Sequence, residues 1–156
     1  MKKALTYMNI ILVLLALLII ILVIGYNSYH RDYYTCESDL IIHAQDARIE
    51  ASVTYYFQGK KGVSLLKGAI IKGEKVTTIS RKNHFRINKN DKGYLHLVTT
   101  QTLTAPSDEA AVQDLQRYLP DFYFTKNASR DFVIHKQGDG LVFSTGYMPA
   151  FYCVKE

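Results

Sequence analysis

The chain has 156 residues, which is enough for one domain of common size and a membrane anchor but too few for two independent hydrophobic cores. Hydrophobic residues make up 48% of the sequence and tyrosine occurs 12 times, a composition typical of a folded, β-rich protein and not of a disordered one. The formal net charge is +5, but the basic residues are scattered, so the charge does not indicate nucleic-acid binding.

An uncharged apolar run, IILVLLALLIIILVIG, covers residues 10–25. A helix of about 20 residues crosses a hydrocarbon core about 30 Å thick. We therefore predict a transmembrane helix over residues 7–26, with Tyr7 and Tyr26 as aromatic anchors at the two interfaces.

The charges on the two sides of this run predict its orientation. Lys2 and Lys3 precede the run, whereas Arg31 is followed at once by the acidic Asp32. The positive-inside rule therefore places residues 1–6 in the cytoplasm of a bacterium and residues 27–156 in the periplasm. This predicts an inner-membrane protein with a periplasmic domain.

A cleaved signal peptide is the alternative interpretation of the run, and VIG before Tyr26 is a tolerable cleavage context. Signal-peptide cores usually contain about 7 to 15 apolar residues and end in an A-x-A-like site. This run is longer and lacks such a site, which favours a retained anchor.

The two cysteines, Cys36 and Cys153, stand at opposite ends of the predicted exported domain. Disulfides persist in an oxidising compartment, and a bridge between these residues would close almost the whole domain into one loop. Two buried reduced thiols are the alternative. Redox catalysis is a third interpretation, although the sequence contains no C-x-x-C motif.

Strand and turn signals alternate after the anchor. ASVTYYF, residues 51–57, places Val53, Tyr55 and Phe57 on one face, and the turn QGKKG and the strand VSLLKGAII follow. KGE then leads into KVTTISR and HFRIN, and KNDKG predicts a tight hairpin turn before YLHLVTTQTL. The local order of these strands predicts an antiparallel meander.

One soluble helix is predicted in APSDEAAVQDLQRYLP, with Ser107 as its N-cap, Pro120 as its stop, and Val112, Leu115 and Leu119 on its apolar face. FYFT, DFVIHK, LVFST and AFYCV read as further strands. The predicted fold class is therefore α+β: an antiparallel meander or lipocalin-like barrel of about eight strands with one helix. The last strand carries Cys153, so the predicted bridge would join the two ends of the sheet.

Motifs for catalysis are missing from the sequence. It contains no G-x-S-x-G, no glycine-rich phosphate loop and no H-E-x-x-H, so we expect neither an enzyme nor a cofactor. The five histidines, His30, His43, His84, His96 and His135, are isolated from one another, so we expect no metal site. The basic stretch SRKNHFR, residues 80–86, is read as a solvated strand edge that Lys and Arg protect from aggregation.

Several stretches resemble the FidL-like inner-membrane proteins of enterobacteria: CESDL, YYFQGKKGVSLLKG, ISRKNHFRI, DLQRYLPDF and FYCV. The organisation is also similar to that of the ToxS, VtrC, MyfF and PsaF accessory proteins. The resemblance implies a membrane-bound partner, a single-span transcription regulator with a cytoplasmic winged-helix domain of the ToxR-like or CadC-like type. The small protein would read no DNA and would stabilise or tune the sensor domain of its partner.

Two hypotheses about function follow. The first is an accessory protein that forms a heterodimer with such a regulator through an exposed strand edge. The second is a stand-alone binder of a lipid or bile-type amphiphile, whose barrel interior would be lined by Tyr55, Phe57 and Leu65.

The hairpin around NKNDKG also suggests a pH-sensitive pair. If paired residue numbers sum to 180, His84 lies directly opposite His96, and two protonated imidazoles would repel each other. A register that sums to 184 places His96 opposite Asn88 instead. The sequence fits both registers, and two solvated, uncoupled histidines are the alternative that the ordinary behaviour of exposed histidine favours.

Overall fold

The computed structural model describes residues 2–90 and 93–155. These residues form two compact units that divide between Tyr33 and Tyr34. The first unit is a single helix, and the second is an antiparallel β-barrel. In chain order the elements are α1 Lys2–Asp32, β1 Tyr33–His43, β2 Arg48–Gln58, β3 Lys61–Lys72, β4 Lys75–Lys89, β5 Leu95–Thr104, α2 Val112–Gln116, the 3-10 helix η1 Asp121–Tyr123, β6 Ser129–Gln137, β7 Gly140–Thr145 and β8 Met148–Lys155.

Helix α1 contains the predicted membrane-spanning segment. Its stretch Asn9–Tyr29 has a mean hydropathy of 3.0 and is long and apolar enough to cross a membrane. A helix needs no partner for its backbone polar groups, because every turn bonds to the next. The structure describes the backbone of Lys2, Lys3 and Arg31 but not their side chains, on which the predicted orientation depends.

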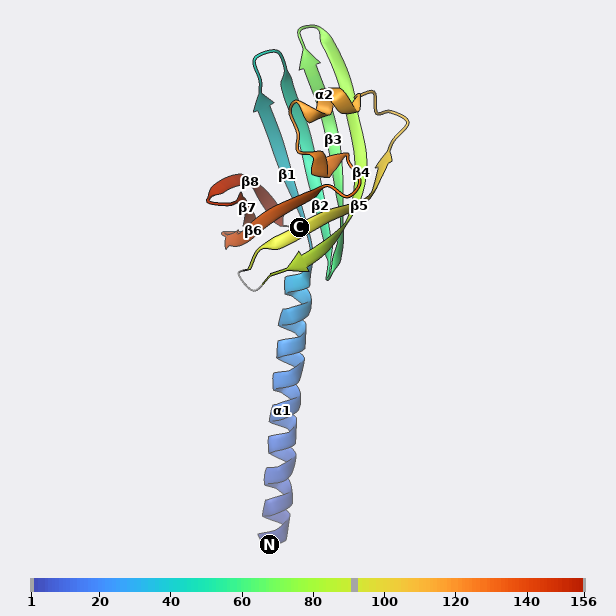
Figure 1. Ribbon diagram of the computed structural model, residues 1–156. Coiled ribbons are helices and arrows are strands. Elements are labelled where there is room, and N and C mark those ends of the chain that lie inside the picture. Colours follow the sequence, from blue (N-terminus) through green and yellow to red (C-terminus); the bar gives the residue numbers. More distant parts are fainter. Residues whose placement is uncertain (1, 91–92, 156) are drawn as a thin grey trace. The chain divides into compact units, whose positions relative to one another are not determined.

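The second unit is a closed barrel in which each strand neighbours the next, from β1 to β8, and β8 returns to β1. Figure 1 shows this meander as a progression of colour around the barrel. The predicted antiparallel order, the number of strands and the closure are all confirmed. Gly73 and Gly138 have φ of 59° and 57°, which is the left-handed backbone that the predicted turns after β3 and β6 require.

The strands alternate between buried and exposed residues, so the inner face of the closed sheet is the core of the barrel. On β2 the buried side chains include Val53, Tyr55 and Phe57, as the alternation in the sequence predicted. On β4 the inward positions include Arg81, Asn83 and Phe85, so KVTTISR and HFRIN form one long strand instead of two.

Aromatic side chains fill the middle of the barrel. The Tyr55 ring lies 5.4 Å from the Phe143 ring and 5.7 Å from the Phe151 ring, measured between centroids. Phe143 and Phe151 stack at 4.6 Å, and Phe132 meets both edge-on. Offset and edge-to-face pairs of this kind add to the free energy gained by burying the rings.

The connection between β5 and β6 differs from the prediction in two respects. α2 is shorter than the predicted helix and begins after Ala111, so Ser107 is not its N-cap. The reason is that Asp108 binds β4 instead of entering a first helical turn: its carboxylate accepts hydrogen bonds from Arg81 and from the Ser80 backbone N–H. Leu115 is buried as predicted, whereas Val112 is 42% exposed.

The second difference concerns FYFT, which was expected to be a strand. Phe122 and Tyr123 instead belong to η1, and both are buried. The backbone carbonyl of Phe122 accepts hydrogen bonds from the side chains of Asn83 on β4 and Thr99 on β5. Aromatic burial against the barrel therefore outweighs the strand preference of this segment.

Candidate functional site

A disulfide joins Cys36 on β1 to Cys153 on β8. The two Cα atoms lie 5.4 Å apart, the residues are separated by 117 positions in sequence, and both side chains are fully buried. The predicted bridge between the two ends of the sheet is therefore confirmed. It lies where the first and last strands meet.

The pairing between β1 and β8 is short. In the described part of the chain, these strands are in register at two positions only, Cys36 with Lys155 and Glu37 with Val154. An uninterrupted antiparallel ladder would continue from there with Ser38 opposite Cys153 and with residues 39–41 opposite residues 150–152.

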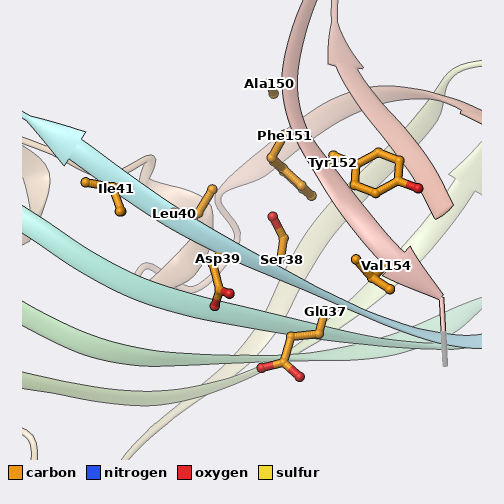
Figure 2. A pocket seen from close by; sticks show the side chains of 9 residues that line it. All are labelled: Glu37, Ser38, Asp39, Leu40, Ile41, Ala150, Phe151, Tyr152 and Val154. Atoms are coloured by element: carbon orange, nitrogen blue, oxygen red, sulfur yellow. The ribbon is translucent and has the colours of Figure 1, made fainter. Parts of the chain in front are cut away.

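The residues that would continue this ladder line a groove instead. Figure 2 shows β1 and β8 close together at Glu37 and Val154 and far apart at Ile41 and Ala150. The groove has a volume of about 640 Å³. We call it the seam groove; its lining residues are Glu37, Ser38, Asp39, Leu40, Ile41, Ala150, Phe151, Tyr152 and Val154.

The seam groove combines apolar surface with acidic groups. Ile41 is 59% exposed and Val154 is 53% exposed, so apolar side chains face solvent on both of its walls. Glu37 and Asp39 are exposed on the β1 side, and the Glu37 carboxylate accepts a hydrogen bond of 2.5 Å from Ser52 Oγ. An extended partner segment with apolar and basic residues would complement this surface.

Two of the three predicted ligand-lining residues lie inside the barrel. Tyr55 is fully buried and Phe57 is 4% exposed, but both pack against other aromatic rings. The expectation for Leu65 is wrong. Leu65 lies opposite the outward-facing Thr54, and its neighbour Leu66, opposite Val53, points inward.

A pair of tyrosines forms the polar centre of the barrel. The hydroxyl groups of Tyr55 and Tyr123 lie 2.6 Å apart and share a hydrogen bond. Burial raises the pKa of Tyr55 well above its ordinary value, and the neighbouring Tyr123 raises it further. Burial also raises the pKa of Tyr123. Both phenols therefore stay protonated in the folded barrel at physiological pH.

The histidine pair is not formed. Strands β4 and β5 follow the register that places His96 opposite Asn88, and a shift in register after His84 places His84 opposite Gln101. His96 Nδ1 instead lies 2.7 Å from the Asp131 carboxylate on β6. The arrangement of two imidazoles on which the predicted pH sensor depended is therefore wrong.

Among the described residues, no group of three or more His, Cys, Asp or Glu side chains is placed to hold a metal ion.

The seam groove was not predicted from the sequence, because nothing in residues 37–41 or 150–154 differs from ordinary strand sequence. Only the end of the β1–β8 ladder reveals it.

Comparison with known proteins gives one family match. The model of a family described as the YqeJ C-terminal domain matches residues 33–153, which cover the barrel from the first residue of β1 to the disulfide cysteine of β8. No curated protein matches the chain. The resemblance to FidL-like proteins stays a prediction.

Proposed function

Because this chain belongs to the YqeJ C-terminal domain family, its barrel is a recognised module, and we propose that it acts as a membrane-anchored accessory protein. In this proposal α1 is the anchor in the bacterial inner membrane and the barrel lies in the periplasm. The barrel binds and stabilises, or tunes, a single-span ToxR-like or CadC-like transcription regulator. The resemblance to FidL-like proteins supports this type of partner.

The early end of the β1–β8 ladder carries the proposal. A strand whose backbone N–H and C=O groups lack a neighbour can take an extended segment of another chain as an added strand. The seam groove presents such edges on β1 and β8, at the place where the first and last strands of the closed sheet meet. The Cys36–Cys153 disulfide joins β1 to β8 next to the groove and so fixes the position from which the two strand edges separate.

Two further observations support the compartment and the anchor. The Cys36–Cys153 bridge fits an oxidising compartment such as the periplasm. Helix α1 has the length and apolarity of a membrane span. The stand-alone amphiphile binder receives less support, because the aromatic rings proposed to line its cavity pack against one another.

The partner can be identified by site-specific photocrosslinking in intact cells. A photoreactive phenylalanine analogue at Ile41 or Val154 would probe the seam groove, and the same analogue at Val76 would probe an exposed apolar position elsewhere, on β4. We expect the groove positions, and not position 76, to crosslink to an extended periplasmic segment of a single-span protein with a cytoplasmic DNA-binding domain. Crosslinks to a second copy of this chain, to lipid alone, or equally from position 76 would contradict the proposal.

A blocking substitution tests the consequence for the regulator. Ala150 is exposed and lines the groove, so Ala150→Arg should fill it without disturbing the core. We expect this variant to lower the amount of regulator and the transcription of its target genes, as deletion of the gene should. Val76→Arg is the matched control, because Val76 is also exposed but lies outside the groove. Equal effects of the two variants would count against the groove as the binding site.

A further inference from the structure

Four cationic side chains gather on the outer face of β3 and β4. Lys61 and Lys67 on β3 and Lys82 and Arg86 on β4 are all exposed. Lys61 lies directly opposite Arg86. Lys82 lies opposite Leu65, and Lys67 is two residues further along β3 on the same face of the sheet. We call these four residues the basic face.

The basic face is not the edge of a sheet. β4 pairs with β3 on one side and with β5 on the other, so the backbone of its SRKNHFR segment already has partners. The expected role of these cations, protection of an open strand edge from aggregation, therefore does not apply. Of the two arginines in this segment, Arg81 points inward to Asp108, and Arg86 points outward.

The arrangement of the basic face is unfavourable for the isolated barrel. Like charges directly opposite each other on neighbouring strands destabilise a sheet, as Lys61 and Arg86 do here. In the part of the chain that the structure describes, none of the four cations forms an ion pair.

Of the strands that flank β3 and β4, β5 contains no Asp or Glu, and the acidic residues Glu37 on β1, Glu50 on β2 and Asp131 on β6 have other partners. Glu37 accepts a hydrogen bond from Ser52, and Asp131 lies against His96. Glu50 forms an ion pair with Arg48, with 2.7 Å between the charged atoms. The charge of the basic face is therefore left for an external anion.

We propose that the basic face docks the barrel onto anionic phospholipid headgroups of the membrane in which the chain is anchored. Half-buried apolar residues, Val63 and Leu65, lie between the cations on β3. An array of flexible cations with apolar side chains between them suits a diffuse anionic surface, because lysine stems lie along the surface while their ammonium groups reach phosphates. A discrete pocket for one small anion would need converging donors instead.

The proposal rests on the proposed membrane anchoring, which also favours lipid over an acidic protein as the occupant. Only residues 30–32 separate the candidate span from the first residue of β1. A connection this short keeps the barrel within reach of headgroups at all times, so even a weak attraction to them is effective.

The test compares two membranes that differ only in headgroup charge. The full chain is reconstituted into nanodiscs of phosphatidylcholine alone or of phosphatidylcholine with phosphatidylglycerol. The acylation rate of each lysine is then measured by mass spectrometry. We expect Lys61, Lys67 and Lys82 to react several-fold more slowly in the anionic discs, and exposed Lys136 on β6 to react equally in both. High salt should remove the difference, since the Debye length falls to about 3 Å at 1 M.

A charge variant makes the test quantitative. Each Lys or Arg near an anionic surface strengthens the attraction by about fivefold, so Lys61→Gln with Arg86→Gln should abolish most of the protection of Lys67 and Lys82. Lys136→Gln is the matched control and should leave that protection unchanged.

The remaining outcomes separate the alternatives. Failure of the chain to enter nanodiscs would contradict the anchoring itself, whereas insertion with equal acylation in both membranes would overturn only the docking. Inorganic phosphate added to the uncharged discs distinguishes a free anion from a lipid, and full protection by phosphate alone would also overturn the docking. Protection that appears only when an acidic periplasmic protein is added would assign the face to that protein instead.

Discussion

The phenolic oxygens of Tyr55 and Tyr123 lie 2.6 Å apart, although the two residues are 68 positions apart in sequence and both are buried. This hydrogen bond ties η1 to the inner face of β2. Because burial raises the pKa of both phenols, the folded barrel keeps two protons that the unfolded chain releases near its ordinary tyrosine pKa of 10.0.

The tyrosine pair therefore predicts sensitivity to alkaline pH. The raised pKa values leave their contribution to stability intact below pH 10, and each phenol should lower the free energy of unfolding by about 1.4 kcal/mol per pH unit above that point. Urea unfolding at pH values on both sides of 10 should show a smaller alkaline loss for Tyr55→Phe with Tyr123→Phe than for the natural sequence. Tyr147→Phe is the control, since Tyr147 is fully exposed. An unchanged alkaline loss in the double variant would contradict the prediction.

The ion pair between Arg81 and Asp108 should be a major determinant of stability. Their side chains are 5% and 1% exposed, and Arg81 also donates a hydrogen bond to the Ala110 carbonyl. Asp108→Ala would leave a buried guanidinium without its partner, which typically costs about 3 to 5 kcal/mol. Chemical denaturation measures this loss.

A more exposed pair provides the matched control for that experiment. Lys72 Nζ lies 2.9 Å from the Asp114 carboxylate. Their hydrogen bond raises the pKa of Lys72 and lowers the pKa of Asp114, so both groups are held in their charged forms. Because this pair is open to solvent, Asp114→Ala should cost much less than Asp108→Ala. If both variants lost a similar amount of unfolding free energy, burial would not be the reason for the contribution of the Arg81–Asp108 pair to stability.

The disulfide should be complete in the exported protein and should contribute strongly to its stability. A thiol titration of the denatured, unreduced chain should find no reactive thiol. Replacing both Cys36 and Cys153 by Ser should lower the free energy of unfolding by about 4 to 5 kcal/mol in the chain-entropy model, because the loop spans 117 positions. Two reactive thiols in the titration would refute the bridge.

His84 and His96 should act independently, because they are not cross-strand partners. The stability effects of His84→Gln and His96→Gln should add in the double variant within about 0.5 kcal/mol. In contrast, His96→Gln and Asp131→Asn should not add, since His96 and Asp131 are in contact. A large coupling between the two histidines, measured in the same double-mutant cycle, would restore the pH-sensor hypothesis.

Local patterns in the sequence determined the elements of the barrel. The alternation at Val53, Tyr55 and Phe57 identified the inward face of β2, and the glycine turns marked where most strands end. The positions of the two cysteines indicated the bridge between the ends of the sheet. These predictions succeeded because a strand with a buried face has a period of two, and because few residues other than glycine tolerate a positive φ.

Tertiary contacts decided those features for which the local sequence pattern is compatible with two structures. Leu65 and Leu66 are both apolar, so only the pairing of β2 with β3 shows which one is inside. The local sequence predicts Asp108 in the first turn of a helix, but in the fold its carboxylate accepts hydrogen bonds from Arg81 on β4. The histidine register, the early end of the β1–β8 ladder and the basic face all depend on which strands lie side by side and at what offset. That offset is set by packing the barrel interior as a whole, and no single stretch of the sequence contains it.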